Sequence, residues 1–254
     1  MTRLTIQSTI NIRENQITKA KQMRRLTIVQ TLYTAYCLVS FTALGITVLV
    51  INTFLPSLRS RRAVAGRFSR AFLRVARIRF SVDGLHRLPQ VPCVVVANHS
   101  SYIDGLVAAA ALPPDFAFVI KKEMVRVPLA GLLLRRLGSQ FVERFDRHKG
   151  GVDARRVLKL AATGQSLVFF PEGTFTELPQ VGKFLGGAFA TAARSEMPVV
   201  AMAILGTRAV MPPGIATIRR LPIHVEILEV LTATEAKQRC RELIASAVGE
   251  PLAP

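Results

Sequence analysis

Hydrophobic and polar positions divide the chain into a long uncharged N-terminal segment, a short basic segment and a region of short apolar runs. Residues 26–58 contain no charged side chain. An apolar stretch of this length is typical of a segment that lies in a bilayer, and it exceeds the apolar part of a signal peptide. The alternative, a buried core helix, is usually shorter and amphipathic. We therefore expect a membrane anchor at residues 26–58, after a basic tail at residues 1–25.

Basic residues flank this anchor on both sides: Lys19, Lys21, Arg24 and Arg25 precede it, and Arg59, Arg61 and Arg62 follow it. Because basic flanks tend to stay in the cytoplasm, a single span would leave one of them on the wrong side. We expect two short helices that fold back near Gly45 and form a re-entrant anchor.

Residues 59–79 predict a basic amphipathic helix. Arginines recur at helical spacing with apolar residues between them: Arg67, Arg70, Arg74 and Arg77. Beside an apolar anchor, such a helix is expected to lie on anionic lipid, and the alternative is a solvated charged face.

From residue 80 to 254 short apolar runs alternate with helical patterns, which predicts one catalytic domain of the α/β class, with a mixed, largely buried sheet flanked by helices. The runs that predict strands are 78–82, 93–97, 116–120, 166–170, 198–204 and 223–230. The helical patterns are 104–112, 128–137, 152–163, 184–194 and 234–248.

The charge balance indicates an anionic partner surface. The 34 Lys and Arg residues against 16 Asp and Glu give a net charge of +18, which suits lipid headgroups, nucleic acid or polyphosphate cofactors. Nucleic acid is disfavoured because Trp is absent, Tyr occurs 3 times and no nucleic-acid-binding motif is present. The three cysteines are widely spaced and form no CxxC pattern: Cys37, Cys93 and Cys240. We interpret them as reduced packing residues in a protein that faces the cytosol.

The first segment with candidate chemistry is residues 98–104, which directly follow an apolar run. On a continuous helix His99 and Asp104 would point about 140° apart. If His99 lies in a turn and Asp104 starts the helix, the carboxylate can fold back to the imidazole and make it a general base. The ordinary alternative is a turn histidine beside a helix-capping aspartate.

Two further segments carry groups suited to phosphate. Residues 138–144 end in Arg144, whose planar guanidinium suits bidentate phosphate binding, although a surface pair with Glu143 or Asp146 is the simpler interpretation. Residues 169–174 place Glu172, Gly173 and Thr174 in one turn after an apolar run. Glu172 is able to orient a ligand hydroxyl or hold a basic side chain, and the other two offer donors to an oxyanion. The alternative is a simple turn. Downstream, Lys183 either adds charge near this turn or is a solvated loop lysine.

In this order, these segments and the apolar run with Pro198 resemble the PlsC-type 1-acylglycerol-3-phosphate O-acyltransferase family, also called lysophosphatidate acyltransferases. The family's blocks are NHx4D, GxxFxxR, FPEGT and a Pro-containing strand, and the match covers roughly residues 79–230. The resemblance implies that His99 is the general base and Asp104 its partner. It implies acceptor-phosphate binding by Arg144, Glu172 and Gly173.

The resemblance further implies an acyl-CoA or acyl-carrier-protein donor, a lysophosphatidate acceptor, a phosphatidic acid product, and no metal or redox cofactor. We expect the membrane to be a bacterial-type inner membrane, with the catalytic domain on its cytoplasmic side. Two departures limit this inference: Phe175 stands where the third block usually has Arg, and Ala201 where the fourth often has a second proline.

Three other functions remain open. An acyltransferase for another lysolipid, such as a lysophospholipid or an aminoacyl lipid, would accommodate Phe175. A thioester hydrolase would need a nucleophile, but the sequence contains no G-x-S-x-G serine. Ser100 and Ser101 are then the candidate nucleophiles. A non-catalytic basic membrane-binding protein would make no use of His99 and Asp104.

Overall fold

The computed structural model describes residues 3–143, 147–214 and 217–253, and of residues 3–26 and 147–151 it describes the backbone alone. In this part of the chain seven strands form one sheet in the order β1-β7-β6-β2-β5-β3-β4. The strands are β1 (Phe80–Asp83), β2 (Val94–Ala97), β3 (Phe116–Lys121), β4 (Gln140–Val142), β5 (Ser166–Phe169), β6 (Val199–Leu205) and β7 (Ile223–Leu231). All neighbours pair in parallel except β6 and β7, so the sheet is mixed, as expected.

The five expected helices of the catalytic domain are confirmed, with shifted ends: α3 (Asp104–Ala111), α4 (Ala130–Arg136), α5 (Arg147–Ala162), α6 (Gly187–Arg194) and α8 (Ala236–Val248). Four short elements were not expected: the strand β4, the helix α7 (Thr207–Val210), and the 3-10 turns η1 (Leu85–Arg87) and η2 (Lys122–Arg126). Elements of three to five residues are too short to show a hydrophobic period.

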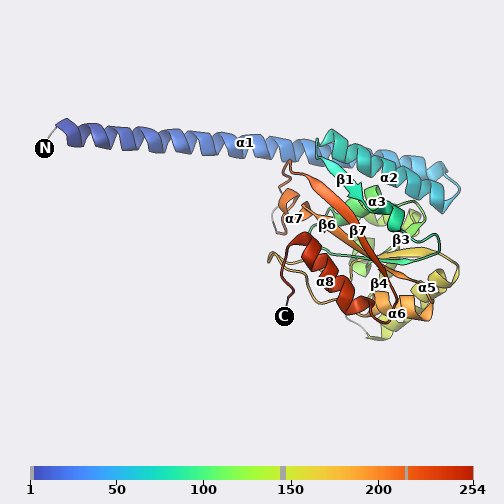
Figure 1. Cartoon of the computed structure of the whole chain (residues 1–254). Helices are drawn as coiled ribbons and strands as arrows, with labels where there is room; N and C mark the ends of the chain where they lie inside the picture. Colours follow the sequence, from blue (N-terminus) through green and yellow to red (C-terminus); the bar gives the residue numbers. More distant parts are fainter. Residues whose placement is uncertain (1–2, 144–146, 215–216, 254) are drawn as a thin grey trace.

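Helices cover both faces of the sheet (Figure 1). Successive residues of β2 point to opposite faces: Val95 packs in a core with α2 and α3, and Val94 in a second core with α5, α6 and α8. All four residues of β2 are buried, which accounts for its uninterrupted apolar run. The three cysteines are buried and unpaired, in agreement with a packing role.

The N-terminal apolar segment differs from expectation. Helix α1 (Arg3–Phe54) is continuous through Gly45, so the expected fold-back there is wrong. One glycine inside a helix costs only about 1 kcal/mol relative to alanine. The chain turns instead around Pro56, whose ring cannot continue a helix. Helix α2 (Leu58–Val75) follows, and Ser57 caps its start by accepting the Ser60 N–H at 3.1 Å.

The second half of α1 lies along the domain that contains the sheet, called the sheet domain below, while its first half runs clear of it (Figure 1). Near one end of this contact Thr34 accepts the Ile218 N–H at 3.1 Å, and near the other Arg136 reaches the Asn52 carbonyl at 3.4 Å. The opposite face is an apolar stripe, with side chains 47–81% exposed, formed by Ile28, Leu32, Tyr36, Val39, Ile46, Val50 and Phe54. By length and composition alone, Thr27–Phe54 would suffice to cross a membrane.

Helix α2 is the expected basic amphipathic helix, and several of its arginines bind the protein itself. Arg62 donates to the Leu137 carbonyl at 2.9 Å, and Arg70 donates to the Ala110 carbonyl at 2.6 Å. Phe72 and Leu73 of the same helix are buried. Arg67 and Arg74 remain exposed. Helix α2 therefore joins α1 to the sheet domain and keeps a basic outer surface.

Candidate active site

The candidate residues gather where parallel strands end. Strands β2, β5 and β6 run in the same direction, so their carboxyl ends meet at one edge of the sheet. His99 lies two residues beyond β2, Glu172 three beyond β5 and Thr207 two beyond β6. Three separate parts of the chain thereby contribute to one site.

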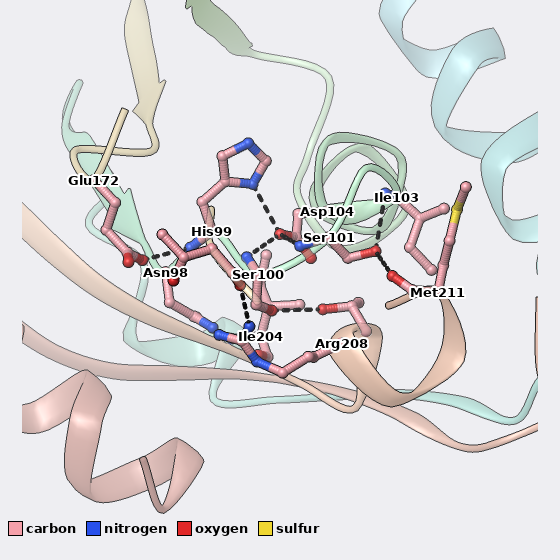
Figure 2. Close-up of polar contacts among 12 residues, drawn as sticks. Asn98, His99, Ser100, Ser101, Ile103, Asp104, Glu172, Ile204, Arg208 and Met211 are labelled. Carbon is pink, nitrogen blue, oxygen red and sulfur yellow. Dashed lines mark hydrogen bonds and ion pairs between the residues drawn. The ribbon is translucent and has the colours of Figure 1, made fainter. Parts of the chain in front are cut away.

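His99 and Asp104 form the pair that the sequence predicts (Figure 2). Nδ1 of His99 lies 2.8 Å from Oδ2 of Asp104. His99 stands in the turn after β2 and Asp104 is the first residue of α3, so the carboxylate folds back. The same Oδ2 accepts the backbone N–H groups of Ser100 at 2.6 Å and Ser101 at 2.8 Å. Asp104 therefore both holds the turn and fixes the imidazole.

This arrangement determines which nitrogen of His99 is available. Asp104 is fully buried, and an ionised carboxylate only accepts hydrogen bonds, so Nδ1 carries the proton. Nε2 is then the nitrogen with a free lone pair. The side chain of His99 is 22% exposed, so its ring is partly accessible from the surface.

Aromatic rings enclose the imidazole. The ring of Phe170 lies 4.8 Å from that of His99, and the ring of Phe175 lies 4.7 Å from it in a T-shaped arrangement. Tyr102 packs on Phe175 at 4.7 Å and is 65% exposed. Position 175, where a basic residue was expected from the family pattern, therefore places an uncharged ring against His99.

Glu172 connects two stretches of backbone. Its Oε1 accepts the His99 N–H at 2.7 Å, and its Oε2 accepts the Gly182 N–H at 2.7 Å. Burial raises the pKa of the Glu172 carboxyl, and these two hydrogen bonds partly oppose the rise. Since both oxygens already accept protein N–H groups, Glu172 orients the backbone beside His99.

The other predicted binding residues lie around the same turn. Gly173 adopts a left-handed φ of 78°, and its N–H donates to the Phe170 carbonyl at 3.1 Å. Thr174 and Lys183 are exposed, Lys183 directly after Gly182. Arg144 lies outside the described residues. The structure describes the segment before it, where β4 pairs with β3 and the Glu143 N–H donates to Asp153 at 2.8 Å.

Several buried polar residues hold the site together, a role that the sequence did not assign to them. Asn98 donates to the Ile204 carbonyl at 2.9 Å and accepts the Ile204 N–H at 2.8 Å. Ser100 Oγ lies 3.1 Å from Thr207 Oγ1, and Ser101 Oγ donates to the Met211 carbonyl at 2.8 Å. These bonds tie the turn after β2 to β6 and α7 (Figure 2). Asn98 was within a recognised block, whereas nothing in the sequence indicated Thr207.

Comparison with known proteins identifies the family of the chain. The Acyltransferase family model matches residues 79–205, which is half of the chain. A chloroplast 1-acyl-sn-glycerol-3-phosphate acyltransferase of Arabidopsis thaliana is 30% identical over 175 residues, covering 65% of this chain and 49% of that protein. The 1-acyl-sn-glycerol-3-phosphate acyltransferase of Pseudomonas aeruginosa is 31% identical over 133 residues, covering 51% of this chain and 50% of that protein. The chain thus spans about half the length of these relatives.

A solved structure shares the fold. The crystal structure of the 1-acyl-sn-glycerophosphate acyltransferase PlsC from Thermotoga maritima superposes with a TM-score of 0.75 at 22% identity, covering 88% of this chain and 96% of that one. At this identity the likeness shows the fold alone. The family model and the fold together confirm the resemblance found in the sequence, and the chain belongs to the acyltransferase family.

Proposed function

We propose that this chain transfers a fatty acyl group from an acyl thioester to the hydroxyl of 1-acylglycerol-3-phosphate, giving phosphatidic acid. The observation that carries the proposal is the 2.8 Å contact between His99 Nδ1 and Asp104, which leaves Nε2 available at the carboxyl edge of the sheet. The names of the relatives support the choice of acceptor.

In the proposed reaction Nε2 of His99 takes the proton of the acceptor hydroxyl as its oxygen attacks the thioester carbonyl. The carbonyl becomes a tetrahedral oxyanion, which collapses by breaking the carbon–sulfur bond. The imidazolium then returns the proton to the departing thiolate. Buried Asp104 stabilises the imidazolium in between. A positioned base of this kind contributes about 10²- to 10⁴-fold.

The donor in this proposal is acyl-CoA or an acyl-carrier protein, and the acceptor phosphate meets the exposed groups around the turn after β5. Thr174 offers a hydroxyl donor there and Lys183 a positive charge, and both are exposed. Both fit an anionic acceptor better than Glu172 does, because its carboxylate would repel a phosphate. We include no metal or redox cofactor in this scheme.

A second acceptor class has a specific observation in its favour. Phe175 presents an aromatic ring to His99, at the position where the family pattern carries a cation. A lysophospholipid with a zwitterionic headgroup carries no net negative charge, so it does not need a cation at position 175. Such a headgroup could contact the aromatic ring instead. The preference between the two acceptors is therefore part of the test below.

Hydrolysis through a serine nucleophile is disfavoured by the contacts of the two candidate serines. Ser100 and Ser101 are buried, and their hydroxyls are engaged with Thr207 and Met211. A serine nucleophile needs its hydroxyl within reach of the base.

We further propose that α1 and α2 form a one-sided membrane anchor. A helix that contacts the same domain at Thr34 and at Asn52 runs along its surface over about 27 Å. A crossing helix would instead be surrounded by lipid along this length. The exposed apolar stripe of α1 would lie in the lipid and the exposed arginines of α2 near the headgroups, with the catalytic domain on the cytoplasmic side.

The test is release of free thiol from a long-chain acyl-CoA by the detergent-solubilised protein, with and without lysophosphatidate, together with identification of the lipid product. His99→Ala is the control. Release and phosphatidic acid formation that require both lysophosphatidate and His99 would establish the function. Release without acceptor would indicate a hydrolase. Transfer to lysophosphatidylcholine in preference to lysophosphatidate would assign the second acceptor class, and no transfer from acyl-CoA or acyl-carrier protein to either lipid would refute the proposal.

A further inference from the structure

The loop at residues 171–183, called the site loop below, needs support from outside itself. It joins β5 to the segment before α6 and contains no helix and only an isolated bridge at Val181. It carries Glu172 and Phe175, both in contact with His99, yet much of it is exposed, including Leu178 at 61%. Segments with few buried contacts open easily, which would move both groups away from His99.

Arg208 holds the site loop from one side. Its Nε and Nη2 donate to the two carboxylate oxygens of Glu250 at 2.9 and 3.1 Å, and its Nη1 donates to the Thr176 carbonyl at 2.6 Å. Thr176 directly follows Phe175. The side chains of Arg208 and Glu250 are each only 19% exposed, so this bidentate pair is largely shielded from water. Arg208 is seen beside the site in Figure 2.

Arg241 holds the same loop at its other end. Its Nε donates to the Gly182 carbonyl at 2.8 Å and its Nη2 to the Val181 carbonyl at 3.1 Å, with a further bond to the Ala253 carbonyl. Val181 also pairs with the segment after α8: its N–H donates to the Pro251 carbonyl at 2.9 Å, and its carbonyl accepts the Ala253 N–H at 2.9 Å. Residues 250–253, called the strap below, therefore run along the site loop.

The contacts continue from the strap to the catalytic turn without a gap. The strap fixes Val181, and the next residue, Gly182, donates its N–H to Oε2 of Glu172, whose Oε1 accepts the N–H of His99. The approach at Gly182 is close, because a Cβ there would lie 2.9 Å from Oε2 of Glu172. Movement of the strap would thus displace Glu172 and loosen the backbone that carries His99.

We propose that Arg208 and Arg241 are positioning residues for the acyl transfer, acting by holding the strap against the site loop. The inference rests on the proposed function for its kinetic part. Both arginines and the strap lie beyond the family-matched segment 79–205. Neither arginine touches the imidazole, so the effect of each on rate passes through Glu172, Phe175 and the His99 backbone.

The kinetic experiment compares Arg208→Ala, Arg208→Lys and Glu250→Gln in the full chain. Because small displacements of a catalytic group are costly, we expect Arg208→Ala to lower kcat about 10- to 100-fold with little change in KM for the donor. Arg208→Lys keeps the charge without the bidentate geometry, so its kcat should lie between those of wild type and Arg208→Ala. The matched control is the exposed pair Arg239–Glu229, at 3.3 Å, where Arg239→Ala should leave kcat unchanged. Unchanged kcat per folded molecule in Arg208→Ala would overturn the proposal.

A double-mutant cycle separates positioning from general stability. If Arg208 acts through Glu172, the fold-loss of kcat in the double variant Arg208→Ala/Glu172→Gln should be smaller than the product of the fold-losses in the two single variants. Multiplicative effects would contradict the route through Glu172.

Amide hydrogen exchange gives a readout that needs no activity. In Arg208→Ala the amides of His99 and Gly182 should exchange at least about 10-fold faster, while amides in β2 keep their protection. If exchange is faster in Arg208→Ala but the protein shows no acyl transfer, the proposed function fails, while the proposed role of the strap in holding the site loop is supported. Unchanged exchange at both amides would refute the proposed role of the strap, even if the protein is an active enzyme.

Discussion

Oδ2 of Asp104 lies 2.8 Å from Nδ1 of His99 and at the same time accepts the two backbone N–H groups of the turn that carries His99. One buried carboxylate oxygen thus sets the shape of the turn and the tautomer of the imidazole. Because the same oxygen performs both functions, the spacing between His99 and Asp104 has to let the carboxylate reach the turn and the imidazole together.

Asp104→Asn should lower kcat by about 10²- to 10⁴-fold while the protein stays folded. The amide oxygen is able to keep the N–H groups of Ser100 and Ser101, but it cannot stabilise the imidazolium. The measurement is kcat for acyl transfer together with the melting temperature. Activity within a few-fold of wild type would contradict the role of Asp104 as partner of His99.

Glu172 should make stability depend on pH. Burial raises the pKa of Glu172 above its ordinary 4.5, so the folded protein binds this proton more tightly than the unfolded chain. The stabilising effect is therefore fully present below the unfolded pKa and is lost as the pH rises through the folded pKa. Melting temperatures from about pH 4 to about pH 8 should show this decline in wild type relative to Glu172→Gln. Parallel curves for the two proteins would contradict it.

Phe175→Arg should shift acceptor preference toward lysophosphatidate. A guanidinium beside His99 would attract the acceptor phosphate, and we expect the ratio of kcat/KM for lysophosphatidate over lysophosphatidylcholine to rise about 5- to 50-fold. Phe175→Leu is the control, because it removes the ring without adding charge. An equal change of the ratio in both variants would show that the charge is not the cause.

Asn98→Ala should destabilise the protein. Asn98 is 4% exposed and supplies the partners of both Ile204 backbone groups, so its loss leaves two buried groups unpaired. At about 1–3 kcal/mol for each, we expect the free energy of unfolding to fall by about 2–6 kcal/mol. Denaturant titration measures this. Gln238→Ala, which removes an exposed hydrogen bond to Glu242, should change it by less than about 0.5 kcal/mol.

Val39→Glu should weaken attachment to anionic vesicles. Val39 lies in the apolar stripe of α1 and is 70% exposed, and a carboxylate there would oppose burial in lipid. Co-sedimentation with vesicles measures the bound fraction. Val152→Glu, at a position 60% exposed on α5 across the sheet, is the matched control and should bind like wild type. Equal binding of both variants would place the attachment elsewhere.

Much of the fold could be predicted from local patterns. The buried strands β2 and β6 read as uninterrupted apolar runs, and α3 and α8 show helical spacing, because burial on the sheet selects side chains at each position. Elements too short for a period, such as β4 and α7, left no such signal. The fold-back expected near Gly45 was wrong because a single glycine interrupts a helix only weakly, whereas the proline at position 56 ends it.

The amino-acid sequence by itself determined the apolar N-terminal helix, the class of the fold and the pairing of His99 with Asp104, since each depends on residues close together in the chain. The tertiary structure alone decided what supports them. Glu172 meets the His99 N–H across 73 positions of sequence, and Arg208 meets Glu250 across 42. Such contacts depend on the strand order and on the path of the segment after α8, and no local pattern of hydrophobic and polar residues encodes either.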